Sequence, residues 1–191
     1  MCAPSFEIAG RRTNTDFRSQ TLLLPVHGDD VMVRGKINRT NKVLVDWADI
    51  LTEIDEVAAA LEDAGWETLV LHPGDVATTD ASATGNPGFR LLVPNSEFEA
   101  LYSTVSASEA AFDQFEVYRA RDTNVRIFVV VVKSEETTDA VLFPVFYDSD
   151  TDRAFVETLR TESVIWTTVS DLGNERRCSF RHAEPALFLP Q

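Results

Sequence analysis

The sequence has very few lysines for a chain with so many charged residues. Three lysines, Lys36, Lys42 and Lys133, stand among 17 cations, which face 31 aspartates and glutamates for a net charge of −14. Surface carboxylates keep a protein soluble in concentrated salt, where the Debye length falls to ~3 Å and self-repulsion is screened. We therefore expect a halophilic protein, adapted to a salt-rich cytoplasm.

Cysteines and long apolar runs are also scarce. The two cysteines, Cys2 and Cys178, form no C-x-x-C pair, which argues against a disulfide framework or a thiolate zinc site. The longest apolar run, 127–132, is too short to cross a bilayer. Residues 1–10 lack the basic flank and apolar stretch of a signal peptide. These features predict a soluble, cytoplasmic protein with no membrane association.

Familiar catalytic motifs are missing as well. The sequence contains no G-x-S-x-G elbow, Walker loop, G-x-G-x-x-G fingerprint or H-E-x-x-H pair. A nuclease core of the restriction-enzyme type needs an acid two residues before its lysine, but Lys133 follows Val131 and Val132. The sequence therefore indicates no cofactor and leaves open whether the protein is an enzyme.

Charge divides the chain into two parts. Residues 1–42 carry seven cations and four acids, a balance of +3, whereas the remainder carries 10 cations and 27 acids, a balance of −17. We expect a poorly ordered N-terminal extension over 1–42, with at most a short strand at 21–26, followed by a single domain over 43–185 and a C-terminal tail over 186–191. A basic arm could alternatively tether nucleic acid, but the acidic body is not expected to bind it.

Hydrophobic periodicity predicts an α+β fold. One apolar stripe predicts a helix over 46–64, and a capping-box pattern starts another at Ser96. A third helix ends near Arg160. Between them, apolar and β-branched runs predict strands, with a loop over 76–88. The expected strands cover 66–71, 89–93, 115–120, 125–132, 140–147, 164–169 and 177–182.

The order of these elements is αββα-βββ-αββ, with about three helices. Consecutive strands favour a mixed or mainly antiparallel sheet. The strand over 125–132 is apolar on both faces, so we expect both of its faces to be buried. Pro144 lies inside the strand over 140–147 and predicts either an edge strand or a bulge there.

The best candidate site is the segment His72-Pro73-Gly74-Asp75, a tight turn at a strand end. His72 and Asp75 could ligate a divalent metal or share a proton as catalytic groups. The alternative is a purely structural turn, in which proline and glycine set the backbone and the aspartate bonds back to it.

The sequence has two other histidines, His27 and His182. His27 lies in a similar His-Gly-Asp segment with Asp29, and the two segments could converge on one cation, although a chance match is the simpler explanation. His182 is expected to be a hydrogen-bonded strand residue and not a ligand.

Several segments resemble a family of uncharacterised haloarchaeal proteins. The most specific is Gly65-Trp-Glu-Thr-Leu-Val-Leu-His-Pro-Gly-Asp-Val76. Leu91-Leu-Val-Pro94, Phe115-Glu-Val-Tyr-Arg119 and the strand ending Tyr147-Asp148 add to it, and the likeness covers roughly residues 44–185. The resemblance implies a haloarchaeal source, which agrees with the charge, and implies no activity or catalytic residue.

Two functions follow as hypotheses. The first is a non-catalytic interaction or regulatory module that has a protein partner or forms a homo-oligomer. The second is a metal-assisted hydrolase or small-molecule enzyme with its site at His72 and Asp75.

Overall fold

The computed structural model of the chain describes residues 6–13, 47–83, 85–107, 112–120 and 125–189. The element order from α2 onward is αβββαβββαββ, which establishes an α+β fold with two mixed sheets. The first helix of the described residues is α2, Trp47–Asp63, close to the range predicted from its apolar stripe. Gly65 follows it with a φ of 90°, a left-handed conformation that favours glycine after a helix end.

The five-stranded sheet has the order β1-β5-β6-β7-β2. β1 pairs antiparallel with β5, β5 with β6 and β6 with β7, whereas β2 joins parallel to β7. The strands are β1 (Phe6–Thr13), β2 (Glu67–Val70), β5 (Gln114–Ala120), β6 (Val125–Ser134) and β7 (Asp139–Asp148).

The four-stranded sheet has the order β3-β4-β8-β9. β3 pairs antiparallel with β4, β4 parallel with β8, and β8 antiparallel with β9. The strands are β3 (Asp75–Thr79), β4 (Gly88–Leu92), β8 (Ile165–Ser170) and β9 (Arg177–His182). The register places three complete rows of outward positions across this sheet.

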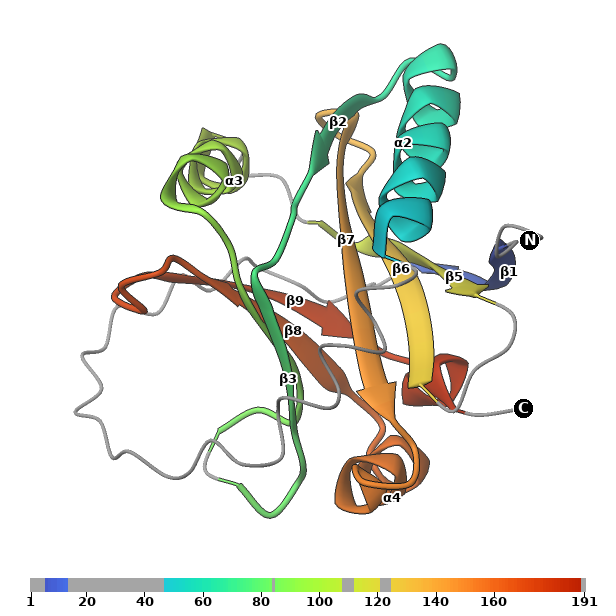
Figure 1. The fold of residues 1–191 in the computed structure, drawn as a ribbon. Helices are drawn as coiled ribbons and strands as arrows, with labels where there is room; N and C mark the ends of the chain where they lie inside the picture. Colours follow the sequence, from blue (N-terminus) through green and yellow to red (C-terminus); the bar gives the residue numbers. More distant parts are fainter. Residues whose placement is uncertain (1–5, 14–46, 84, 108–111, 121–124, 190–191) are drawn as a thin grey trace.

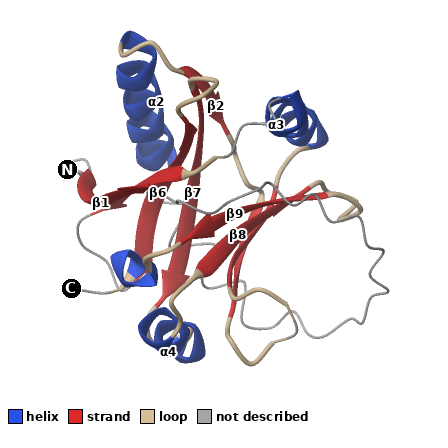
Figure 2. Cartoon of the chain, turned by 180° about the vertical axis from the view of Figure 1, so that it is seen from behind, coloured by secondary structure: helices blue, strands red, loops and turns tan. Residues whose placement is uncertain are grey.

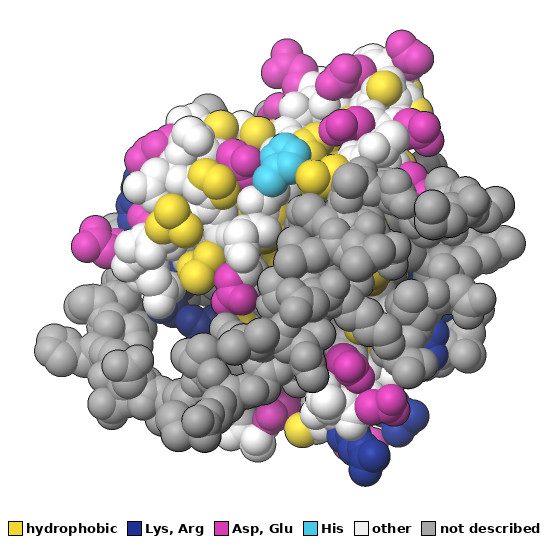
Figure 3. Space-filling model, in the orientation of Figure 1, with side chains coloured by type: hydrophobic (Ala, Val, Ile, Leu, Met, Phe, Trp, Pro, Cys, Tyr) yellow, Lys and Arg dark blue, Asp and Glu magenta, His cyan; other side chains and the backbone are white. Residues whose placement is uncertain are grey.

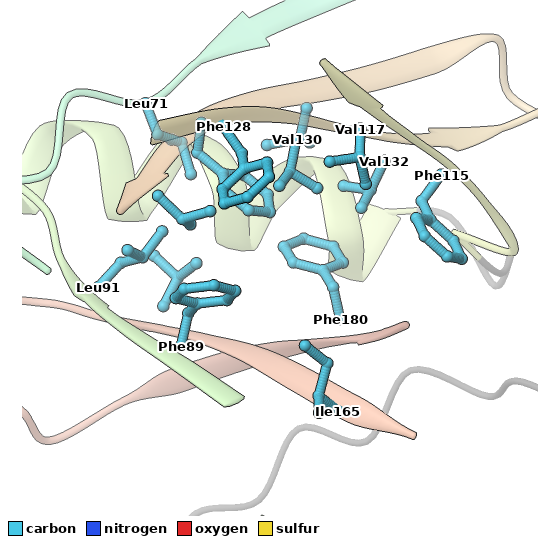
Figure 4. Close-up of a cluster of buried hydrophobic side chains, with 14 of the residues drawn as sticks. Leu71, Phe89, Leu91, Phe115, Val117, Phe128, Val130, Val132, Ile165 and Phe180 are labelled. Atoms are coloured by element: carbon cyan, nitrogen blue, oxygen red, sulfur yellow. The ribbon is translucent and has the colours of Figure 1, made fainter. Parts of the chain in front are cut away.

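β6 is buried on both faces, as its apolar sequence predicts. Val129 and Val131 lie with α2 in one hydrophobic cluster, and Phe128, Val130 and Val132 lie in the cluster between the two sheets. All five are at most 1% exposed. Figure 4 shows how side chains of both sheets point toward one another in the second cluster. The four-stranded sheet thus covers one face of β6 and α2 covers the other, which agrees with the prediction that both faces are buried.

The remaining helices lie at the two ends of the space between the sheets (Figures 1 and 2). They are α3 (Asn95–Ala107), α4 (Arg153–Thr161) and the 3₁₀ helix η1 (Pro185–Phe188). Each of these helices packs a phenylalanine into the core between the sheets: Phe98 from α3, Phe155 from α4 and Phe188 from η1. Within the described ranges, no helix is both long and apolar enough to cross a membrane.

Two predictions about strands were wrong. The predicted loop over 76–88 contains most of β3, because Asp75–Thr79 forms a hairpin with β4 and packs Val76 on the core. Pro144 creates neither an edge strand nor a bulge, since β7 lies between β6 and β2 in continuous register. The proline is tolerated because β2 pairs β7 only as far as Leu142, so the missing N–H lies beyond that partner.

The N-terminal part holds one described element inside the predicted extension. β1 pairs with β5 along its length, with an irregularity between Ile8 and Gly10. The strand expected at 21–26 lies outside the described residues. The predicted tail over 186–191 includes most of η1, whose Phe188 is fully buried.

Candidate functional site

The segment from His72 to Gly74 links the two sheets. Before it, the Leu71 amide donates to Leu142 O at 2.8 Å, continuing β2 along β7. After it, the Gly74 amide donates to Leu92 O at 2.8 Å, and β3 begins at Asp75. Pro73 is buried while His72 is exposed. The turn is therefore held at both ends by backbone pairing, and its histidine faces the solvent.

Glu97 in the first turn of α3 fixes the orientation of His72. Its Oε2 accepts the His72 amide at 2.7 Å, and its Oε1 lies 3.0 Å from Nδ1. The two side chains are 46% and 21% exposed. When Nδ1 donates to the carboxylate, Nε2 of the neutral ring is an acceptor. A histidine held in this way is suited to act as a base or a metal ligand.

Sequence reasoning missed Glu97, which lies 25 residues after His72. The only signal was its place in the first turn of the expected helix at Ser96, where a carboxylate also suits the helix dipole. The contact depends on how α3 packs beside the β2–β3 link, and spacing along the chain does not reveal this.

His72 and Asp75 lie in one turn, but they do not form a metal centre with a third side chain. In the part of the chain that the structure describes, no group of three or more His, Cys, Asp or Glu side chains could hold a metal ion. Val76 packs on the core, so strand alternation puts Asp75 on the opposite, outer face of the four-stranded sheet. His27 and Asp29 lie outside the described residues.

The other chemically versatile side chains are buried. His182 is fully buried, its Nε2 lies 2.8 Å from Thr167 Oγ1, and burial lowers its pKa to about 3. Burial also raises the pKa of the Cys178 thiol to about 11, so this cysteine is protonated at neutral pH. Neither group has the exposure or ionisation that solvent-accessible chemistry requires.

A second site emerges on the outer face of the four-stranded sheet. Paired residues form three rows of four positions: Thr79-Gly88-Trp166-Arg181, Ala77-Arg90-Thr168-Ser179 and Asp75-Leu92-Ser170-Arg177. The alternate residues of the same strands point into the core. We call these twelve outward positions the arginine–tryptophan face. In neither Figure 1 nor Figure 2 does a described helix cross this face.

The charge of this face differs from that of the whole chain. It holds three arginines and one aspartate, a balance of +2, in a chain of net charge −14. Acidic side chains outnumber basic ones on the surface shown in Figure 3. The arginines come from β4 and β9, which are not adjacent in the sheet. Only tertiary structure collects them on one surface.

Two of these arginines form no ion pair with a described carboxylate, as is also true of Arg126 and Arg153. Among the described residues, exposed Arg90 makes no ion pair, and Arg177 donates only to the Asn174 amide oxygen, at 3.2 Å. In contrast, Arg176 Nη2 donates to Glu99 Oε1 at 2.6 Å and lies over the rings of Phe98 and Tyr102. That hydrogen bond lowers the pKa of Glu99. Carboxylates thus neutralise Arg176, whereas no described carboxylate forms an ion pair with Arg90 or Arg177.

The comparison with protein families decides where the chain belongs. Residues 35–190 match the model of the Family of unknown function (DUF7529). The chain belongs to this family. No curated protein and no solved structure matches the chain.

The DUF7529 match includes every element from α2 to η1 and both candidate sites, whereas β1 precedes it. The match also extends past both ends of the sequence resemblance, which covers roughly residues 44–185. The family description assigns no activity. The geometry of His72 and Glu97 and that of the arginine–tryptophan face therefore provide the basis for a functional proposal.

Proposed function

We propose that this DUF7529 protein is a non-catalytic interaction or regulatory module that binds a partner through the arginine–tryptophan face. The single observation that carries the proposal is the pair Arg90 and Arg177, which no carboxylate of the described residues neutralises although acids outnumber cations 31 to 17. A protein with such an excess of acids has many opportunities to pair its arginines internally. Two that are left unpaired on one sheet face are suited to an external anionic group.

The composition of the face supports binding. Tryptophan and arginine are the residues most enriched where single side chains dominate binding energy. Trp166 and Arg181 are half-buried and directly opposite each other on β8 and β9. Thr168 Oγ1 and Ser179 Oγ lie 3.1 Å apart in the adjacent row and provide further hydrogen-bonding groups. These groups lie on one face of the sheet, in two adjacent rows.

The test compares capture by matched variants of the full chain in concentrated KCl. We expect the wild-type protein to retain a stoichiometric protein partner, or to form a homo-oligomer by light scattering. Arg177→Glu and Trp166→Ala should abolish that association. Arg160→Glu is the control, because Arg160 is exposed on α4 and pairs with Glu157 away from the face. Failure to find any stoichiometric partner or oligomer, or retention of it by both face variants, would contradict the proposal.

The proposed setting is the salt-rich cytoplasm of a haloarchaeon. Its support is the net charge of −14 with only three lysines. The likeness of the segment Gly65–Val76 to haloarchaeal sequences adds to it. Native mass spectrometry of the protein isolated from a haloarchaeal cytosolic fraction, as opposed to membranes or culture medium, tests this setting directly.

A second candidate function rests on the contact between Glu97 and His72. A carboxylate that accepts from both the amide and Nδ1 of one histidine leaves Nε2 suited to serve as a base or a ligand. The corresponding proposal is a metal-assisted hydrolase or small-molecule enzyme that uses His72 and Asp75. Titration calorimetry with Zn²⁺, Mn²⁺ and Mg²⁺ tests it, with Thr68→Ala as a control on the preceding strand. Equal metal binding by wild type, His72→Ala and Asp75→Asn would exclude this function.

A further inference from the structure

We infer that β3 pairs antiparallel with β3 of a second copy of the chain, which joins the two four-stranded sheets across a two-fold axis. The contact lies at the edge of this sheet and goes beyond the proposed function, which concerns its outer face. Three features of β3 support the dimer: its unpaired edge, its composition and the register that two copies can form.

β3 is an edge strand, because it pairs with β4 on one side only. Figure 1 shows β2 and β3 as consecutive parts of one length of chain, each at the edge of its own sheet. Within the described part of the chain, residues 76–79 form no backbone hydrogen bond outside the pairing with β4. The loop after β3 leads to α4, where the Ala81 amide donates to Thr158 Oγ1 at 2.9 Å. The outer edge of β3 therefore presents N–H and C=O groups to a further strand.

The other edge strands in the described ranges have features that oppose such pairing. β1 has an irregularity between Ile8 and Gly10, β2 has only four residues, and β9 carries Arg177 and Arg181. Natural proteins use bulges, short strands and charges of this kind to prevent association at sheet edges. β3 has no proline and no cation, its one charge is on Asp75 at its start, and its register with β4 is continuous. It is thus the edge most suited to pair with another strand.

A second copy satisfies this edge better than a peptide from another protein does. A bound peptide becomes the new edge strand and again leaves one side unpaired. When β3 pairs with β3 of a second copy, each strand covers the edge of the other. The two-fold contact also closes after two copies, so it forms a dimer and not a fibre.

The residues of β3 are compatible with one another in a complete antiparallel register. With Ala77 opposite Ala77 of the second copy, Asp75 lies opposite Thr79, and Val76 lies opposite Thr78. No like charges are then opposite each other, and the β-branched residues suit a sheet. A slip by one residue would set outward side chains opposite core-facing ones, and a slip by two residues shortens the overlap. The register centred on Ala77 is therefore the one we expect.

The charge of the chain makes the strength of this dimer depend on salt. Two chains of net charge −14 repel each other, and KCl at about 1 M shortens the Debye length to ~3 Å and screens this repulsion. The dimer should therefore become stronger as KCl rises, whereas an association through arginine–carboxylate pairs should become weaker. Because two strands of five residues form a small contact, we expect a reversible dimer that dissociates on dilution.

Sedimentation velocity of the full-length protein over a range of protein and KCl concentrations measures the dimer. Ala77→Lys and Ala77→Asp each place like charges opposite each other at the two-fold axis, so each should weaken the dimer about fivefold. An equimolar mixture of these two variants should restore an affinity within about twofold of wild type, because opposite charges then meet. Ala60→Lys and Ala60→Asp are the controls, because they make the same changes of charge at an exposed position of α2. They should leave the affinity within about twofold of wild type.

Circular dichroism of each variant establishes that a lost dimer does not reflect unfolding. The inference is overturned if the protein is monomeric under all conditions in which it is folded, or if both Ala77 variants dimerise as tightly as wild type. A mixture that dimerises no better than the separate variants, or assemblies larger than a dimer, would also overturn it.

The arginine–tryptophan face is judged separately, with Arg177→Glu, which should keep the β3 dimer. If the dimer depends on Ala77 and no captured protein depends on Arg177 or Trp166, the present inference stands and the proposed function fails. If capture of a partner depends on the face while the chain stays monomeric, the proposed function stands and the β3 dimer is excluded.

Discussion

Lys133 and Glu116 form a buried ion pair between neighbouring strands of the five-stranded sheet. Lys133 Nζ lies 2.5 Å from Glu116 Oε1, and the side chains are only 4% and 1% exposed. The second carboxylate oxygen accepts the Tyr118 hydroxyl at 2.7 Å, and Nζ lies 5.0 Å from the centre of the Trp66 ring. The one lysine in the described part of this lysine-poor chain is thus committed to an internal contact.

Breaking this pair on one side should be far more destabilising than replacing both partners. Lys133→Met leaves the Glu116 carboxylate buried without its cation, and we expect a loss of about 3–5 kcal/mol in unfolding free energy. The double variant Lys133→Met/Glu116→Leu should lose less, because no uncompensated charge remains. Urea unfolding measures both. Arg160→Ala, which breaks an exposed pair with Glu157, is the control and should cost less than about 1 kcal/mol. Equal losses for the single and double variants would contradict this account.

The buried His182 should make the protein sensitive to acid. Its pKa is lowered to about 3 by burial, below the ~6.5 of an unfolded chain. Between these values the unfolded state binds one proton more than the folded state, so stability falls as pH falls. At pH ~5 the loss from this group is about 2 kcal/mol relative to neutral pH.

His182→Phe tests this pH dependence, because phenylalanine can pack against Phe115 and Phe188 but does not titrate. Urea unfolding from neutral pH to pH ~5 should show a smaller acid loss for this variant than for wild type. Loss of the contact with Thr167 shifts its stability at every pH without changing the slope. Thr167→Val is the matched control, because it removes the same contact but keeps the titrating histidine, and it should retain the wild-type slope. Parallel curves for wild type and His182→Phe would rule out His182 as the source.

Gly88 should tolerate no side chain. It has a φ of 144°, and a Cβ would lie 1.8 Å from the Trp166 carbonyl oxygen, within the backbone of the adjacent strand. We expect Gly88→Ala to lower the unfolding free energy by about 2–4 kcal/mol, since the parallel pairing of β4 and β8 must shift. Gly74→Ala is the control, because open space surrounds that position. Thermal unfolding that shows equal midpoints for the two variants would show that this close approach does not limit stability.

Stability should increase with KCl. Raising the concentration from about 0.1 M to about 1 M shortens the Debye length from ~10 Å to ~3 Å and screens the repulsion of the −14 charge. The thermal midpoint should therefore rise over this range. Glu56→Lys and Asp63→Lys, both at exposed positions of α2, should raise the midpoint at low salt and flatten the dependence. A midpoint that stays constant or falls in wild type would contradict the halophilic interpretation.

Local patterns were sufficient to predict most elements. The stripe that includes Ile50 and Ile54 predicted α2, and the unbroken apolar run of β6 predicted burial on both faces. Such periodicities reflect which side of an element avoids water, so they can be read without knowing the neighbours. β3 was missed because a polar, β-branched segment becomes a strand only when β4 pairs with it.

The candidate sites depended much more on tertiary structure. The turn at His72 and Asp75 was visible in the sequence because histidine, proline, glycine and aspartate are adjacent. Glu97 was not, because its contact with His72 requires α3 to pack beside the β2–β3 link. The same holds for the Glu99 carboxylate, which accepts a hydrogen bond from Arg176 in the β8–β9 connection.

The charge of this protein, its α+β class and the buried faces of most of its helices and strands follow from residue type and local spacing, so they can be predicted along the chain. The tertiary structure alone decided that the chain forms two sheets and that β4, β8 and β9 lie in register. That register brings Arg90, Trp166, Arg177 and Arg181 onto one face, although β4 is more than 70 residues from β8. A periodicity of two shows that such residues share a face of their own strand, but hydrogen bonding between distant strands decides which strands share the sheet.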